Sequence, residues 1–215
     1  MNPPLETPAV YLITKGEATA ENFPQKKKEI LAIIRAAAEN GIALAQIREK
    51  LLPAKLLFEL ASEAVKITSG SNTRILINDR ADIAAASGAG GVHLRADSIS
   101  AGVARAAFPG LLIGVSTHSF ERTLQARDDG ADFVTLAPVF ATPGKGEPLG
   151  LEEFTRIGGE LKPFPVIALG GINATNYEKV LASGGGGFAA IRFLNDRENL
   201  GKVSRSPAVR APLII

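Results

Sequence analysis

Residues 46–50, Gln-Ile-Arg-Glu-Lys, place an amide, two cations and a carboxylate directly after the apolar run 41–45. In an extended strand, side chains alternate between faces, so Gln46, Arg48 and Lys50 point one way and Ile47 and Glu49 the other. An amide and two cations on one face suit the binding of an anion such as phosphate. Long charged side chains also end strands simply to reach solvent, so this segment alone leaves both interpretations open.

The elements that would position this segment are apolar runs alternating with helical patterns. Strands are predicted at residues 10–14, 41–50, 74–79, 91–94, 111–115, 132–139, 165–171 and 187–193. Helices are predicted between them, for example at residues 25–40, 53–67, 151–161 and 173–183. The runs are continuously apolar, as in parallel strands covered on both faces. The α/β pattern predicts one (β/α)8 TIM barrel, and an open doubly wound sheet is disfavoured because no glycine fingerprint follows the first run.

The predicted domain organisation has three parts. Residues 1–9 form a proline-rich N-terminal arm, residues 10–203 the barrel, and residues 204–215 an irregular C-terminal tail. The tail is expected to be irregular because Pro207 and Pro212 interrupt any helix, where an interior proline costs about 3 kcal/mol.

Composition narrows the function classes. The 215 residues carry a net charge of +2, which provides no field suited to nucleic acid or an acidic membrane. The chain has no cysteine and only two histidines, which excludes thiolate chemistry and disfavours a multi-histidine metal site. No targeting pattern or membrane span is recognisable, so we expect a cytoplasmic protein with small-molecule partners and leave a homodimer open.

The active site of such a barrel lies at the carboxyl ends of its strands. Polar residues and glycines collect at these positions, which predicts an anion-binding catalytic mouth. They are Thr14, Gln46, Arg48, Lys50, Asn78, Asp79, Arg95, Asp97, Ser116, His118, Thr142, Lys145, Gly170, Gly171 and Arg192.

Four of these residues allow more than one role. Gly170 and Gly171 either let the backbone approach a phosphate, with the N–H groups of residues 173–175 helping, or simply make a tight turn. Asp79 either ligates Mg²⁺ or caps the helix predicted at residues 80–87. His118 either acts as a general acid or base or bonds to a neighbour, whereas His93, inside a strand, is expected to be structural.

Six ordered motifs resemble the thiamine phosphate synthase family and its sister group, the TenI-like thiazole tautomerases, from about residue 10 to residue 196. They are QIREK at 46–50, INDR at 77–80, GVHL at 91–94, GVSTHS at 114–119, PVFAT at 138–142 with Lys145, and ALGGI at 168–172.

The resemblance implies a synthase that couples hydroxymethylpyrimidine pyrophosphate with thiazole phosphate, releasing pyrophosphate. It implies Mg²⁺ bound by Asp79 and Asp97, and catalytic roles for Lys50, Ser116, His118 and Lys145. The implied substrate-binding residues are Gln46, Ile47, Arg48, Glu49, Lys50, Asn78, Ser116, Thr142, Lys145, Gly170, Gly171, Ile191 and Arg192.

Three departures from the family pattern keep the alternatives open. The usual Gly-Gln-x-Asp is Arg95, Ala96, Asp97 and Ser98 here, so the second metal ligand lies one residue early. A loop threonine is Gly144, and a serine after the eighth strand is Arg192. A tautomerase using His118, or a non-catalytic protein that binds phosphorylated ligands, therefore remains possible as an alternative. Lys50 and Asp79 favour the synthase.

Overall fold

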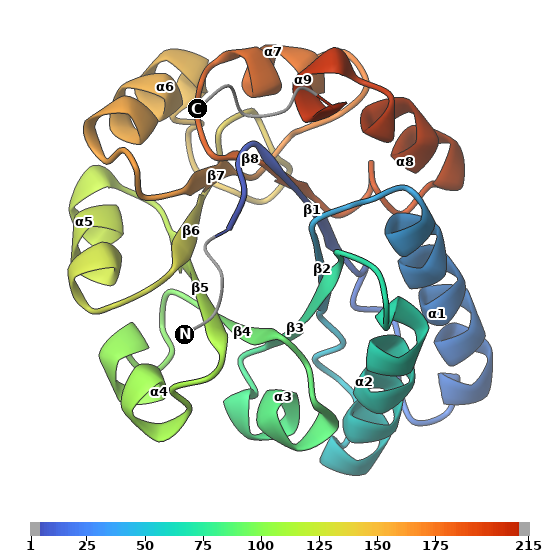
Figure 1. The fold of residues 1–215 in the computed structure, drawn as a ribbon. Helices are drawn as coiled ribbons and strands as arrows, with labels where there is room; N and C mark the ends of the chain where they lie inside the picture. The colour runs from blue at the N-terminus through green and yellow to red at the C-terminus, as the bar shows by residue number, and fades with distance from the viewer. Residues whose placement is uncertain (1–4, 211–215) are drawn as a thin grey trace.

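Eight parallel strands form a closed barrel, and helices surround it (Figure 1). The computed structural model describes residues 5–210, and within them β8 closes the barrel against β1. The strands are β1 Ala9–Ile13, β2 Leu44–Ile47, β3 Arg74–Asn78, β4 Gly91–Leu94, β5 Leu112–Thr117, β6 Phe133–Leu136, β7 Val166–Ala168 and β8 Gly187–Ala190. The helices are α1 Phe23–Glu39, α2 Ala54–Thr68, α3 Ala81–Ser87, α4 Ala101–Ala107, α5 Phe120–Asp128, α6 Gly150–Glu160, α7 Tyr177–Ala182, α8 Arg197–Ser204 and α9 Pro207–Arg210. The predicted (β/α)8 barrel is confirmed.

Two apolar layers hold the barrel together, one on each face of the strands. Tyr11, Leu44 and Phe133 belong to the layer inside the barrel. Leu12 and Ala45, one position further along their strands, belong to the layer beneath the helices. Because successive side chains point to opposite faces, strands that are covered on both sides must be apolar at nearly every position. This is the reason for the continuous apolar runs in the sequence.

The two predicted terminal segments differ from the structure. Ala9 belongs to β1 rather than to an arm. The tail is not irregular throughout its described part, because Pro207 opens α9, whose Ala208 and Val209 pack against the apolar core. Proline is tolerated there because the first turn of a helix needs no N–H from it. The remaining parts of both predictions, residues 1–4 and 211–215, lie outside the described residues.

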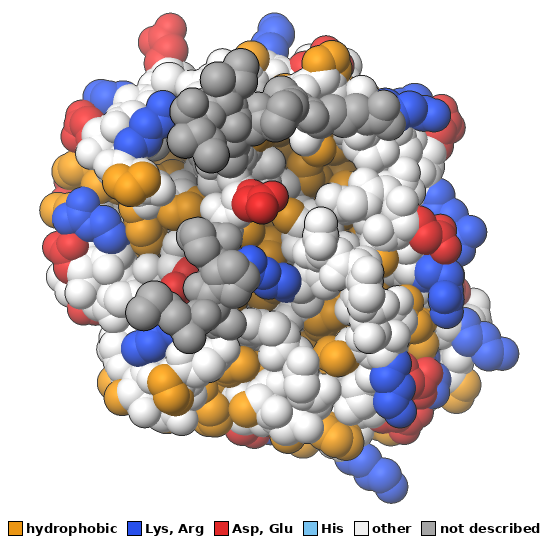
Figure 2. All heavy atoms as spheres, in the orientation of Figure 1, with side chains coloured by type: hydrophobic (Ala, Val, Ile, Leu, Met, Phe, Trp, Pro, Cys, Tyr) orange, Lys and Arg blue, Asp and Glu red, His pale blue; other side chains and the backbone are white. Residues whose placement is uncertain are grey.

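The surface is mostly polar where the helices face outward. Figure 2 shows charged side chains mainly around the periphery of one face and hydrophobic ones nearer its centre. Within residues 5–210, no helix combines the length and the apolar character needed to cross a membrane.

Candidate active site

A layer of polar side chains lies inside the barrel, toward the carboxyl ends of the strands. We call it the polar layer; it comprises Tyr11, Gln46, Asn78, His93, Ser116 and Thr135. Gln46 Nε2 donates to Asn78 Oδ1 at 3.3 Å, which joins β2 to β3. Ser116 Oγ lies 3.0 Å from His93 Nε2, and Tyr11 Oη lies 3.1 Å from His93 Nδ1. The predicted substrate residues Gln46, Asn78 and Ser116 therefore lie in this layer, in two separate hydrogen-bonded groups.

His93 organises this layer from beneath. Its imidazole is buried between Tyr11 and Phe133, with ring centroids 5.6 and 5.8 Å away. Burial lowers the pKa of His93 to about 4, against a small opposing effect of the Asp79 charge. The imidazole is therefore neutral near pH 7, with one nitrogen donating and the other accepting. His93 agrees with its prediction as a buried strand residue, and it holds Ser116 at the mouth.

The strand that carries residues 46–50 ends at Ile47, earlier than the sequence pattern predicts. Ile47 is completely buried in the apolar layer beneath the helices. It also lines a cleft at the ends of β2, β3 and β4, so its predicted contact with a substrate stays a prediction. Beyond the strand, Arg48 is half-buried and Lys50 is exposed.

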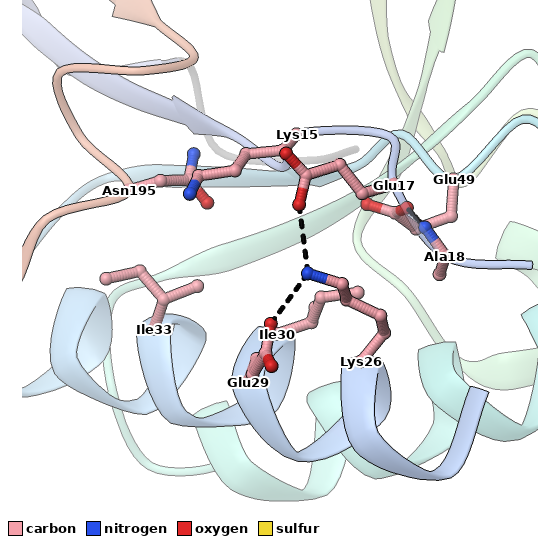
Figure 3. Close-up of a pocket in the computed structure, with 9 residues that line it drawn as sticks. All are labelled: Lys15, Glu17, Ala18, Lys26, Glu29, Ile30, Ile33, Glu49 and Asn195. Atoms are coloured by element: carbon pink, nitrogen blue, oxygen red, sulfur yellow. Dashed lines mark hydrogen bonds and ion pairs between the residues drawn. The ribbon is translucent and has the colours of Figure 1, made fainter. Parts of the chain in front are cut away.

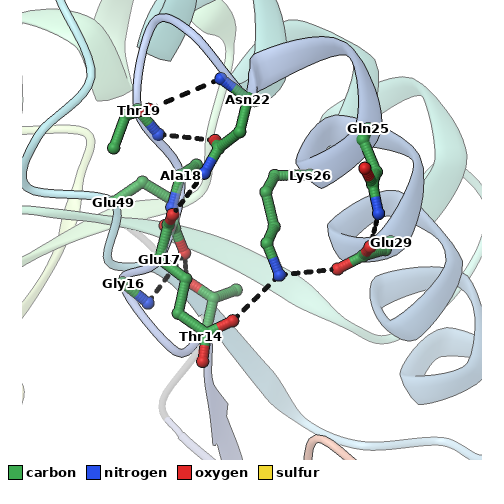
Figure 4. A network of polar contacts seen from close by, with 10 residues as sticks. All are labelled: Thr14, Gly16, Glu17, Ala18, Thr19, Asn22, Gln25, Lys26, Glu29 and Glu49. Carbon is green, nitrogen blue, oxygen red and sulfur yellow. Dashed lines mark hydrogen bonds and ion pairs between the residues drawn. The ribbon is translucent and has the colours of Figure 1, made fainter.

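Glu49 holds the loop between β1 and α1 in place through three hydrogen bonds. Its Oε1 accepts from Thr14 Oγ1 at 2.6 Å and from the Gly16 N–H at 3.1 Å, while Oε2 accepts from the Ala18 N–H at 2.8 Å (Figure 4). The residue is buried, so both of its oxygens serve these bonds. A buried carboxylate needs such partners, so Glu49 has a structural role. Glu49 also lines a cleft at the ends of β2, β3 and β4, and its predicted contact with a substrate stays a prediction.

A small cavity of about 90 Å³ lies between this loop and α1 (Figure 3). Lys26 Nζ contacts Glu17 at 3.0 Å and Glu29 at 2.9 Å, so its charge is paired within the wall. Asn195 Nδ2 donates to the carbonyl oxygens of Ile13 and Ile191 at 2.7 and 2.6 Å. These contacts hold the ends of β1 and β8 together. The polar residues around the cavity are therefore explained by their role in the fold.

A cleft lined by cations opens beside the polar layer, between the ends of β2, β3 and β4. We call it the cation cleft; it has a volume of about 210 Å³ and is lined by Ile47, Glu49, Lys50, Leu52, Leu57, Asn78, Asp79, Arg80 and Arg95. Burial lowers the pKa of Lys50, and the charges of Arg48, Arg95 and Lys145 lower it further, while Asp97 acts in the opposite direction. Such a shift indicates an electropositive site that a bound polyanion would relieve.

Asp79 lines this cleft, and Arg95 contacts both predicted metal ligands, Asp79 and Asp97. Arg95 Nε lies 3.0 Å from Asp79 Oδ2 and 3.2 Å from Asp97 Oδ1. Across residues 5–210, no group of three or more histidine, aspartate or glutamate side chains is arranged to hold a metal ion. As they lie, Asp79 and Asp97 do not fit a Mg²⁺ site. The sequence places Arg95 at the rim, and only the structure reveals this contact.

A second pocket, of about 460 Å³, is lined by the ends of β7 and β8 and by the loop after β6. We call it the glycine cup, after Gly170 and Gly171. It brings together five predicted substrate residues: Thr142, Gly170, Gly171, Ile191 and Arg192. Both glycines have positive φ, of 97° and 68°. A Cβ at Gly171 would meet the Phe140 Cβ at 2.6 Å, so a side chain is excluded by both space and conformation.

The helix after Gly171 begins later than predicted and contributes no N–H groups from residues 173 and 175. The Asn173 N–H donates to Asn176 Oδ1 at 2.9 Å, and the Thr175 N–H donates to Asn173 Oδ1 at 2.8 Å. Helix α7 starts only at Tyr177. Asparagine side chains compete with helical bonds for nearby backbone groups, which explains the delayed start. Two of the three N–H groups that were expected to be free are therefore engaged within the loop.

The remaining predicted catalytic residues, His118 and Lys145, lie on exposed segments. His118 Nδ1 lies 2.7 Å from the Ala137 carbonyl oxygen. A carbonyl can only accept, so Nδ1 carries the hydrogen and Nε2 is the basic nitrogen. The neighbouring Ser119 caps α5 by accepting from the Arg122 N–H, as its position predicts.

The closed barrel, with a cation-lined cleft and a glycine-lined cup at one mouth, defines the class of barrel enzymes that act on small phosphorylated molecules. A family model described as thiamine monophosphate synthase matches residues 10–194. The chain therefore belongs to this family, and the resemblance predicted from the motifs is confirmed.

Individual relatives agree with this assignment. A putative thiamine-phosphate synthase of Geobacter sulfurreducens is 44% identical over 187 residues, which are 85% of this chain and 84% of that protein. A thiamine-phosphate synthase of Caldanaerobacter subterraneus is 38% identical, over 80% of this chain and 81% of that protein. The solved structure of a thiamine phosphate pyrophosphorylase from Pyrococcus furiosus superposes with a TM-score of 0.77 at 30% identity. That superposition covers 91% of this chain and 95% of the other.

Proposed function

We propose that this chain couples hydroxymethylpyrimidine pyrophosphate with thiazole phosphate to give thiamine phosphate and pyrophosphate. The observation that carries the proposal is the presence of two separate anion-suited pockets at one mouth. The cation cleft presents Lys50 and Arg95, and the glycine cup presents Gly171 and Arg192. A reaction between two molecules that each carry phosphate requires two such sites side by side.

The proposed chemistry starts at the cation cleft. The bond between the pyrimidine methylene carbon and the diphosphate oxygen breaks, and its electron pair leaves with the diphosphate. Lys50, Arg48 and Lys145 stabilise the charge that develops there. The thiazole nitrogen, positioned from the glycine cup, donates its lone pair to the methylene carbon and forms the new C–N bond. Gln46, Asn78 and Ser116 orient the pyrimidine ring over the polar layer.

Mg²⁺ is implied by the resemblance, but its expected carboxylates are paired with Arg95. No step of the proposed reaction is therefore assigned to a metal ion. Assembly into a homodimer and a cytoplasmic location both remain predictions.

The test is formation of thiamine phosphate and pyrophosphate by the purified full-length chain from the two substrates, followed by chromatography with and without Mg²⁺. We expect product with the unmodified chain, and a much lower rate for Ser116→Ala. The exposed helix residue Lys28 supplies a control, and Lys28→Met should keep the full rate. Absence of product at high enzyme concentration would exclude the proposal.

A tautomerase remains the second candidate because the exposed imidazole of His118 keeps Nε2 as a base. Its test follows the isomerisation of the carboxylated thiazole phosphate by NMR. If the chain catalyses this reaction and His118→Ala abolishes it, the tautomerase replaces the synthase. An unchanged rate in His118→Ala rules out the assigned role. Ligand binding without turnover in either assay would indicate the non-catalytic alternative.

A further inference from the structure

Three charged side chains at the ends of β3 and β4 form a compact group whose arrangement bears on the metal requirement. Besides its two Nε contacts, Arg95 places Nη2 3.3 Å from Asp97 Oδ2. The guanidinium thus faces both carboxyl oxygens of Asp97 and one oxygen of Asp79. It stands between the two carboxylates, where a bridging cation would bind.

The backbone holds Asp79 firmly in this position. Asp79 has φ of +59° and is the only non-glycine with positive φ in the described part of the chain. Its N–H donates to the His93 carbonyl oxygen at 2.9 Å, which anchors it to the end of β4. A non-glycine residue persists in this conformation only where its surroundings demand it. The carboxylate is thus presented to Arg95 by the fold and not by a flexible loop.

The neighbouring arginine shows that this contact is specific. Arg80 follows Asp79 directly, yet its guanidinium pairs with Asp82 through bonds of 2.8 and 2.6 Å. Two arginines thus line the same cleft, and of these only Arg95 bridges the two carboxylates that the resemblance assigns to a metal. Arg95 also occupies a position where the family pattern expects glycine, which has no side chain to fill that space.

We propose that the guanidinium of Arg95 is the built-in cation of the diphosphate subsite and takes the place of a divalent ion between Asp79 and Asp97. The diphosphate role rests on the proposed function. A guanidinium stays charged at every physiological pH and carries five N–H donors in a rigid fork. Two of its nitrogens face the carboxylates, which leaves donors for the oxygens of a diphosphate. The diphosphate is therefore bound without a metal bridge to Asp79 and Asp97.

The first experiment tests displacement of the metal and needs no substrate. Mn²⁺ alone is titrated into the full chain and followed by electron paramagnetic resonance. We expect the unmodified chain and Arg80→Ala to bind Mn²⁺ equally weakly, and Arg95→Ala to bind it at least about tenfold more tightly, because two carboxylates lose their cation. Adding Asp79→Asn to Arg95→Ala should remove the gain. Equal, Asp79-dependent binding in the unmodified chain and Arg95→Ala would overturn the proposal.

The second experiment measures binding of inorganic pyrophosphate by calorimetry in the presence of EDTA. We expect metal-free binding to the unmodified chain, a loss of roughly tenfold or more in Arg95→Ala, and no change in Arg122→Ala, which alters an exposed arginine on α5. Pyrophosphate binding that requires Mg²⁺, or that is unchanged in Arg95→Ala, would overturn the role of Arg95. A failure of the proposed synthase function would give a different pattern. No thiamine phosphate would form, but Arg95→Ala would still bind Mn²⁺ more tightly than the unmodified chain.

Discussion

The cation cleft and the glycine cup share one mouth but are built by different means. In the cleft, charged side chains such as Lys50 and Arg95 supply the positive field, and Asp79 and Asp97 partly neutralise it. In the cup, the backbone at Gly170 and Gly171 takes left-handed conformations that leave no room for side chains. One pocket therefore depends on charge, which a substitution can remove without disturbing the fold. The other depends on backbone shape, where a substitution disturbs both fold and binding.

This difference suits two ligands of different charge. A diphosphate concentrates more negative charge than a monophosphate, so it gains more from several cations in a partly desolvated cleft. A monophosphate is bound well by a close-fitting backbone and a single arginine. Substitutions in the two pockets, and in the polar layer, test this contrast.

Lys50→Met should lower kcat by about 10²–10³-fold, because it removes a cation where charge develops on the leaving diphosphate. The thermal midpoint should stay unchanged, since Lys50 is exposed. Steady-state kinetics with both substrates provides the measurement, and Lys28→Met is the control for loss of charge alone. A rate within twofold of the unmodified chain would contradict the assignment of Lys50.

His93 is buried inside the barrel, in contact with Ser116, and should make stability depend on pH. Its pKa is about 4 in the folded chain and near 6.5 when exposed, so the unfolded chain binds the extra proton. The stabilisation is complete above pH 6.5 and is lost as the pH falls toward 4, amounting to about 3 kcal/mol in all.

Urea unfolding between pH 7 and pH 4 measures this effect against the variant His93→Gln. The variant retains hydrogen-bonding groups for Tyr11 and Ser116 but cannot titrate. Its free energy of unfolding should therefore fall less steeply with acid than that of the unmodified chain. If the free energy of unfolding falls equally steeply with pH in both proteins, His93 does not contribute to the loss of stability in acid.

Gly171→Ala should destabilise the fold by about 1–3 kcal/mol, because φ of +68° and the approach to Phe140 both oppose a Cβ. It should also raise the KM for thiazole phosphate more than that for the pyrimidine substrate. Thermal unfolding and kinetics measure the two effects. Gly146→Ala is a matched control from the loop after β6, because a Cβ there meets no atom within 4 Å. Equal stability and equal KM values in the two variants would contradict the role assigned to the backbone conformation at Gly171.

Arg192→Ala should have the smallest effect, raising the KM for thiazole phosphate by roughly two- to fivefold, since exposed charges contribute about 0.2–1 kcal/mol. Arg192 lines the cup and is exposed. Arg122→Ala, an exposed arginine on α5, should leave the KM unchanged. A lower KM in Arg192→Ala would instead mean that Arg192 fills space that the phosphate needs.

Much of the fold was predictable because each strand is apolar on both faces and each helix has a periodic buried stripe. Helix α1 buries Ile30, Ile33, Ile34 and Ala37, the stripe that its spacing indicates. Element boundaries were less predictable where side chains compete for backbone groups. Asn173 and Asn176 delay α7, and Glu49 draws the end of β2 toward the first loop.

The order of the motifs along the chain determined the barrel, the family and the location of the mouth. All three follow from local patterns. The spacing of apolar residues, the turn residues and the polar residues at strand ends can each be recognised within a short stretch of sequence. Only the tertiary structure decided the partners of the charged groups. Glu49 accepts hydrogen bonds from residues 31–35 positions away in the sequence. Arg95, after β4, forms an ion pair with Asp79, after the neighbouring strand β3. Which polar side chains pair between different strands depends on the register of the strands and on the conformation of the loops. Residues adjacent in the sequence do not determine either.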